Sequence, residues 1–142
     1  MKTKLFFISL AGLLLLTGYP VFPQAVKSFE DGDKLVVLWT SDDPYVAETV
    51  AFMYTHAAKK NQWFSDVTLI IWGPSAKLIT ENVKLQDKLK SMQKDGVVTE
   101  ACIACANMYG VADSLRTLGI TVKGMGQPLS EYLKSGARVL TF

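Results

Sequence analysis

The chain has 142 residues, of which 15 are Lys or Arg and 13 are Asp or Glu, and 49% of its side chains are hydrophobic. This length and composition are typical of one globular domain with a sizeable core. The formal net charge of +2 is too small to favour a nucleic acid or an anionic membrane surface as a partner, because such partners require a basic patch.

The N-terminus has the pattern of a secretory signal peptide over residues 1–25. Two lysines precede an apolar segment at residues 5–16, which is shorter than the roughly 20 residues of a membrane span. An uncleaved N-terminal anchor is the alternative. Cleavage after Ala25 would leave one domain, residues 26–142, with 13 basic and 13 acidic side chains. We therefore expect an exported protein, periplasmic or secreted, that has no membrane contact after cleavage and no net charge to oppose self-association.

The first part of the domain predicts a strand followed by a helix. Residues 34–41 form a continuous apolar run rich in Val and Leu, which favours a strand covered on both faces. Residues 41–44, Ser-Asp-Asp-Pro, provide a cap, acidic side chains and a proline for a helix start. The helix is predicted to end near Lys60. Its expected apolar stripe consists of Val46, Val50, Met53, Tyr54 and Ala57.

A second strand and a second helix follow. Residues 66–73 predict another buried strand, and a Gly-Pro-Ser turn leads into a helix over residues 76–94. An Asp-Gly pair at residues 95–96 closes this helix. Its expected apolar stripe consists of Leu78, Val83, Leu85 and Leu89.

The C-terminal half predicts three further strands and two helical connections. The first connection begins at Cys102, is interrupted at Gly110 and restarts at Asp113. The second spans residues 127–134, after a flexible Gly-Met-Gly loop and before Gly136. The remaining strands are expected at residues 97–101, 120–123 and 138–141.

Strand and helix alternate along the whole domain with short links, which predicts right-handed βαβ units. The expected fold is of the α/β class, a three-layer α/β/α sandwich around a mainly parallel five-stranded sheet. Ligands of such sheets bind beyond the carboxyl ends of the strands. The loops expected at that edge are residues 40–44, residues 72–75, the turn at Cys102 and residues 123–127.

Cys102 and Cys105 are the only cysteines of the chain, and they lie three residues apart at a switch from strand to helix. A helix start offers unpaired backbone N–H groups and the positive end of the helix dipole, both of which favour a thiolate. We therefore expect Cys102 to be reactive and Cys105, one turn into the helix, to be less so. The alternative in an oxidising compartment is a structural disulfide, although so short a loop saves little unfolded-state entropy.

Other chemistries fit the sequence less well. A thioredoxin-type motif normally follows an early strand and an aromatic residue, whereas Ala101 and two βα units precede Cys102 here. Two cysteines and His56, which is interpreted as a surface residue, do not complete a four-ligand zinc set, although two thiolates suit Cu(I). The glycines form no phosphate-binding motif. We expect no cofactor and no resident metal, because a sulfur relay through a cysteine persulfide requires neither.

The chain resembles the DsrE/DsrF/TusD-like family over residues 34–142. The resemblance lies in the segments VVLWTSDDPYVAETVAFMYTHAAKK, VTLIIWGPSAKLI, GVVTEACIACANMYGV and GITVKGMGQPLSEYLKSGARVLTF. It implies an α/β/α sandwich, assembly into trimers or hexamers, and a role in sulfur relay. The sulfur-accepting cysteine of the family follows the third strand, eight residues before a glycine, and Cys102 and Gly110 have this spacing while Cys105 does not. Family members often have Arg where this chain has Tyr109, so the cation that this Arg would place near the thiolate is missing here.

The leading functional expectation is binding or transfer of sulfane sulfur through Cys102, with Cys105 as the second candidate. Whether this amounts to enzymatic activity is left open. The expected partners are further copies of the chain and a protein that donates or accepts sulfur. The alternative is a non-catalytic oligomeric binding module with a Cys102–Cys105 disulfide or a Cu(I) site.

The residues expected to line the pocket are Ser41, Asp42, Trp72, Gly73, Pro74, Tyr109 and Met125. Aromatic residues expected either at an assembly surface or in internal packing are Tyr54, Trp63 and Phe64.

Overall fold

The computed structural model describes residues 33–142, so the predicted signal peptide at residues 1–25 lies outside the described residues. Within the described part, one five-stranded sheet has the order β4-β3-β2-β1-β5, and every neighbouring pair of strands is parallel. The parallel sheet predicted from the sequence is therefore confirmed. The strands are β1 (Lys34–Trp39), β2 (Asp66–Ile71), β3 (Val98–Cys102), β4 (Thr121–Lys123) and β5 (Arg138–Thr141).

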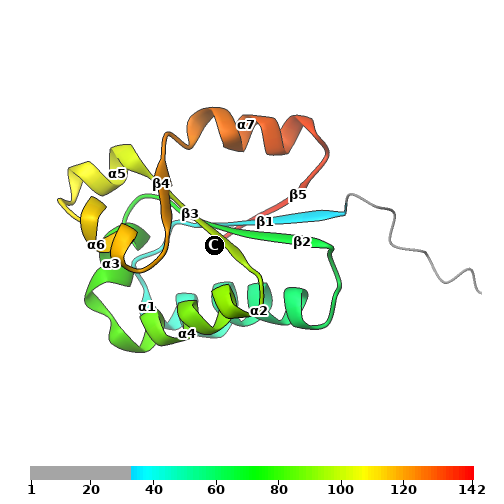
Figure 1. Cartoon of the computed structure of the whole chain (residues 1–142), viewed down its shortest axis with the longest axis horizontal. Coiled ribbons are helices and arrows are strands. Elements are labelled where there is room, and N and C mark those ends of the chain that lie inside the picture. Colours follow the sequence, from blue (N-terminus) through cyan, green and yellow to red (C-terminus); the bar gives the residue numbers. More distant parts are fainter. Residues whose placement is uncertain (1–32) are drawn as a thin grey trace, which may run out of the picture.

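Helices cover both faces of the sheet, which confirms the three-layer sandwich. The helical segments are α1 (Pro44–Val46), the π-helical η1 (Ala47–Ala51), α2 (Phe52–Lys60), α3 (Ser75–Glu81), α4 (Val83–Lys94), α5 (Ile103–Met108), α6 (Ala112–Thr117) and α7 (Gly126–Lys134). α2 and α4 lie against one face, α7 lies against the opposite face, and α3, α5 and α6 gather near the end of the sheet (Figure 1). None of the helices in residues 33–142 has both the length and the apolar content of a membrane span.

Two apolar clusters form on the two faces of the sheet. The large core lies on the side of α2 and α4, where Leu35, Val37 and Trp39 of β1 point, and Trp39 packs edge-on against Phe52 with ring centroids 4.9 Å apart. The small core lies beneath α7, which contributes partly buried side chains to it. The small core is defined by the buried residues Val36, Ile70, Cys102 and Met125. Because successive strand residues point to opposite faces, both cores draw on one apolar run, as the sequence pattern predicted.

The predicted apolar stripe of the first helix is only partly confirmed: Tyr54 packs, partly buried, against the large core, but two other members do not. Val50 and Met53 are exposed, Met53 to 63%. The side chains that face the sheet are mostly small, and they are Ala47, Ala51, Phe52, Thr55 and Ala58. The five-residue π-helical stretch η1 adds residues to its turn and so changes the phase of the face that follows. Small side chains at the contact also let this helix approach the sheet closely, which leaves the larger apolar residues on other sides.

The predicted helix over residues 76–94 is two helices, α3 and α4, separated at Asn82. Asn82 has an extended backbone with φ −114° and ψ 99°, and its side chain accepts a hydrogen bond from the Leu85 N–H at 3.1 Å. It therefore acts as the N-cap of α4. Val83, predicted to be in the apolar stripe, is 68% exposed at the first turn of α4, while Leu85 and Leu89 are buried as expected.

Tyr54 of α2 and the two aromatic residues after α2 mainly contribute to internal packing. Tyr54 and Phe64 are partly buried against the large core. Trp63 lies 6.0 Å from Tyr54 between ring centroids and is 44% exposed. Of the three residues considered for an assembly surface, Trp63 is the one that stays largely accessible.

Candidate functional site

The carboxyl ends of the parallel strands bring the predicted loops to one edge of the sheet, where α3 and α5 also begin (Figure 1). The loop after β1 is tied to the end of the chain, because the Thr40 N–H donates to the Phe142 carbonyl at 2.7 Å. The loop after β2 is tied to β1, because the Trp72 N–H donates to the Trp39 carbonyl at 3.0 Å. Backbone hydrogen bonds therefore hold both of these loops in place at the candidate site.

Cys102 is both the last residue of β3 and the N-cap residue of α5, with φ −75° and ψ 117°. Its side chain lies in the small core, and the residue is only 6% exposed. No hydrogen bond joins its side chain to the N–H groups of α5, so the activation expected from helix capping is not seen. The physical reason is the alternation of β3: Ala101 points into the large core, and Cys102 consequently points to the α7 face.

Cys105 lies one turn into α5 and packs, partly buried, against the same small core. Both cysteines are free thiols in the structure. Burial is the main cause that raises the pKa of the Cys105 thiol. The hydrogen bond and the charge interaction with Cys102 also raise this pKa, whereas the hydrogen bond from the Gly73 backbone N–H lowers it. Cys105 is thus a protonated neighbour of Cys102 at neutral pH.

The turn between β2 and α3 places Gly73 against the cysteine pair. Gly73 has φ +72°, a left-handed conformation that glycine adopts without strain. The hydroxyl of the fully buried Ser75 donates to the Trp39 carbonyl at 2.7 Å and accepts from the Trp72 N–H at 3.1 Å. Ser75 is therefore a structural link between the ends of β1 and β2.

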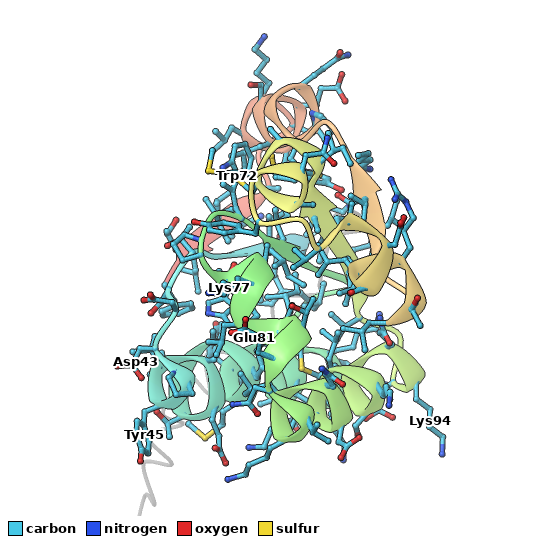
Figure 2. All side chains as sticks on the ribbon, turned by 90° about the vertical axis from the view of Figure 1, so that its left-hand side faces the viewer. Asp43, Tyr45, Trp72, Lys77, Glu81 and Lys94 are labelled. Carbon is cyan, nitrogen blue, oxygen red and sulfur yellow. The ribbon has the colours of Figure 1, made fainter. Side chains whose placement is uncertain are left out.

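The residues predicted to line one pocket fall into two groups. Trp72 and Met125 adjoin the cysteines in the small core. Asp42, Pro74 and Tyr109 line a separate cavity of about 360 Å³, together with residues of α3, and neither cysteine lines that cavity. Figure 2 looks onto this end of the molecule and shows Trp72 apart from Lys77 and Glu81 of α3, which belong to the second group. Ser41 is partly buried, and its hydroxyl accepts the Asp43 N–H at 3.0 Å in the turn before α1.

Three polar residues near the cysteines were not predicted from the sequence. Glu100 is buried on β3, and its carboxylate lies 2.6 Å from the Lys123 ammonium. The Tyr132 hydroxyl of α7 donates to the other carboxylate oxygen at 3.3 Å. The sequence did contain a signal for Glu100: it lies two residues before Cys102 in a predicted strand, so the two side chains point to the same face.

The ionisation of this cluster is set by its close contacts. The hydrogen bond to Glu100 raises the pKa of Lys123, against a smaller opposing effect of burial. Burial is the main cause that raises the pKa of Tyr132, and the charge of Glu100 adds to it. At neutral pH the cluster therefore holds a charged Lys123 and an uncharged Tyr132.

His56 lies on the opposite side of the sheet from the cysteines. Its Nε2 is 2.6 Å from an Asp95 carboxylate oxygen, and this hydrogen bond lowers the pKa of Asp95. His56 also lines a cavity of about 490 Å³ between α2 and α4. Across residues 33–142, no group of three or more His, Cys, Asp or Glu side chains could hold a metal ion.

Comparison with known proteins gives concordant results. A model of the DsrE/DsrF-like family matches residues 33–142. The solved structure of BT1422, a conserved protein of unknown function from Bacteroides thetaiotaomicron, is 38% identical, with 78% of this chain and 95% of that chain covered and a TM-score of 0.75. The crystal structure of the ychN protein from E. coli shares the fold at 18% identity, with 78% of this chain and 99% of that chain covered and a TM-score of 0.62. No curated protein matches the chain.

Proposed function

Because this chain belongs to the DsrE/DsrF-like family, which is generally associated with sulfur relay, we propose that it binds sulfane sulfur on Cys102 and passes it on. The observation that carries this proposal is the position of Cys102. It ends the third strand at the carboxyl edge of a parallel sheet, where such folds bind ligands, and it lies eight residues before Gly110.

The proposed reaction is a thiol exchange at sulfur. The Cys102 thiolate attacks the outer sulfur of a low-molecular-weight persulfide, a new Sγ–S bond forms, and the S–S bond of the donor breaks. The donor leaves as a thiol and takes the proton, while Cys102 holds a persulfide. Transfer to an acceptor thiol is the same exchange in reverse. Electrons and atoms balance without a metal or an additional oxidant.

The burial of Cys102 suits this role. A persulfide in the small core would be screened from water and from free thiols, which would otherwise remove its outer sulfur. Met125 is buried in the same core and is flanked by Gly124 and Gly126, so the proposed route for a donor is a displacement of Met125. Glycine has a wide range of backbone conformations, and a Cβ added at either position would meet no other atom within 4 Å.

Mass spectrometry of the reduced protein after treatment with glutathione persulfide tests the proposal. We expect wild type and Cys105→Ser to gain sulfur that cyanide or a thiol removes, and Cys102→Ser to gain none. Cys105→Ser is the matched control, because it removes a thiol from the same core. Absence of uptake in wild type, or uptake in Cys102→Ser equal to wild type, would contradict the proposal.

The contact between the two cysteines favours one alternative function. Because Cys105 interacts directly with Cys102, the pair could close into a disulfide or bind Cu(I) in a non-catalytic oligomeric module. In that case both cysteines would be required for metal binding, bound Cu(I) would block alkylation of both, and persulfide uptake would be absent. The same mass measurement therefore separates the two functions.

A further inference from the structure

The pairing of β3 with β4 places an ion pair beside Cys102. Lys123 is the register partner of Cys102, and paired residues of neighbouring parallel strands point to the same face with the strands about 4.8 Å apart. Glu100 lies two residues before Cys102 and also shares this face. The Lys123 side chain therefore begins next to Cys102 and reaches back to Glu100, where its ammonium lies 2.6 Å from the carboxylate.

The ion pair between Glu100 and Lys123 places a carboxylate in a largely apolar environment, where its charge is unfavourable. The small core around it consists of Val36, Ile70 and Met125 besides Cys102, and the Glu100 side chain is only 7% exposed. The buried Glu100 carboxylate loses its hydration, and its ion pair with Lys123 has to offset that cost. The Lys123 side chain, by contrast, is 40% exposed, so the core does not enclose it completely.

We propose that Lys123 is the counter-ion of the sulfur anion formed on Cys102, and that Glu100 holds the Lys123 ammonium close by until the anion forms and then competes with the anion for that charge. The inference rests on the proposed role of Cys102 as the reacting thiol. A thiolate or persulfide in an apolar core requires a nearby positive charge, since an isolated buried anion is strongly disfavoured. Lys123 forms no covalent bond and keeps its proton throughout.

The other charged and titratable groups around Cys102 leave this role to Lys123. Cys105 of α5 and Tyr132 of α7 keep their protons at neutral pH. Glu131 of α7 acts on Lys123 at longer range. Lys34 begins β1 at the far end of the sheet, where its ammonium lies 5.1 Å from the centre of the Tyr132 ring and 3.9 Å from Asp66. Among these groups, Lys123 is the cation paired in register with Cys102.

The test measures the alkylation rate of Cys102 by iodoacetamide against pH in the Cys105→Ser background, where Cys102 is the only thiol. We expect Lys123→Met to shift the pH midpoint of reaction upward by about 1 unit, because an opposite charge near a thiol favours its charged form. Glu100→Gln should shift the midpoint downward, because it removes a negative charge and frees the ammonium. Lys123→Arg should retain the wild-type midpoint.

The opposite signs separate this role from a structural one. An ion pair that only supported packing would move both variants in the same direction or in neither. The matched control is the Glu48–Lys88 pair on the α2 and α4 side, with 2.9 Å between its charged atoms, where Glu48→Gln and Lys88→Met should leave the midpoint unchanged. If Glu100→Gln does not fold, the contrast between Lys123→Met and Lys123→Arg decides alone.

An unchanged midpoint in Lys123→Met, or shifts of the same sign in Lys123→Met and Glu100→Gln, would overturn the inference. Alkylation needs no sulfur donor, so its outcome is independent of sulfur uptake. If wild type takes up no sulfur but the alkylation midpoints shift as expected, the sulfur-relay proposal fails and the assignment of Lys123 stands. If uptake occurs and the midpoints do not shift, the reverse holds.

Discussion

At the scale of single residues, the two cysteines differ more in environment than their spacing suggests. Cys102 is a strand residue buried under α7, whereas Cys105 is a helix residue partly buried near the Gly73 turn. The sequence could place Cys102 at a strand-to-helix junction, because both neighbouring patterns are clear. It could not decide whether the side chain follows the helix start or the strand, since a junction residue satisfies both descriptions. In the structure, the Cys102 side chain follows the alternation of the strand and points to the α7 face.

The protonation of Cys105 gives a prediction at this scale. Burial raises the pKa of Cys105, so its thiolate forms only above the pH at which an ordinary cysteine ionises, and its reactivity is lost as the pH falls through that value. In Cys102→Ser, where the contribution of Cys102 is gone and burial remains, the alkylation midpoint should stay above about 8.5, the usual cysteine value. A midpoint below that value would mean that the Gly73 N–H outweighs burial.

At the scale of elements, the strands were predictable and the helix faces were not. Continuous apolar runs over β1 and β2 identify strands that are covered on both faces. Which side of the first helix faces the sheet depends on the π-helical stretch η1, and no local residue pattern predicts such a stretch. The break at Asn82 could have been predicted, because asparagine is a good N-cap. It was missed because the spacing of apolar residues on both sides of Asn82 fits one continuous helix.

The cap at Asn82 has a measurable effect on stability. Asn82→Ala removes the acceptor of the Leu85 N–H, and the free energy of unfolding should fall by about 1 kcal/mol. Chemical denaturation of wild type and variant measures this loss. Asn107→Ala on the exposed side of α5 is the control, where a better helix former should cause no loss. Equal stability of Asn82→Ala and wild type would show that α3 and α4 behave as one helix in solution.

The small side chains of the first helix set its distance from the sheet. Ala51 is fully buried, so Ala51→Leu forces additional atoms into a filled space and should lower the free energy of unfolding by about 1–3 kcal/mol. Met53→Ala on the exposed side should change it by less than about 0.5 kcal/mol. If Ala51→Leu proves neutral while Met53→Ala destabilises, the helix lies with the predicted stripe inward after all.

At the scale of the whole molecule, we expect self-association into a trimer or hexamer. Large apolar side chains are exposed in the described part of the chain, including Tyr45, Met53 and Met108. With no net charge on residues 26–142, nothing opposes their contact between copies. Light scattering at micromolar concentration should give a multiple of the chain mass, and an apolar interface should persist at high salt. A monomeric mass would contradict this expectation.

Export of the chain is the second expectation at this scale. Residues 1–25 have the order of basic, apolar and small residues that signal peptidases process. Cell fractionation followed by mass measurement should therefore find the protein outside the cytoplasm with Val26 as its first residue. Recovery of the full chain attached to membranes would favour the uncleaved anchor instead. The compartment matters for Cys102, because an oxidising one promotes a disulfide in competition with a persulfide.

The place of β5 in the sheet has a consequence for biosynthesis. β5 pairs with β1, and Thr40 hydrogen-bonds to Phe142 across a separation of 102 residues. Among the strands described in residues 33–142, β1 is made first and β5 last, so until β5 is made one edge of β1 has unpaired backbone groups that can pair with another chain. Closing such distant contacts is slow compared with forming local ones. A variant without β5 would therefore leave that edge of β1 open to pairing with another chain.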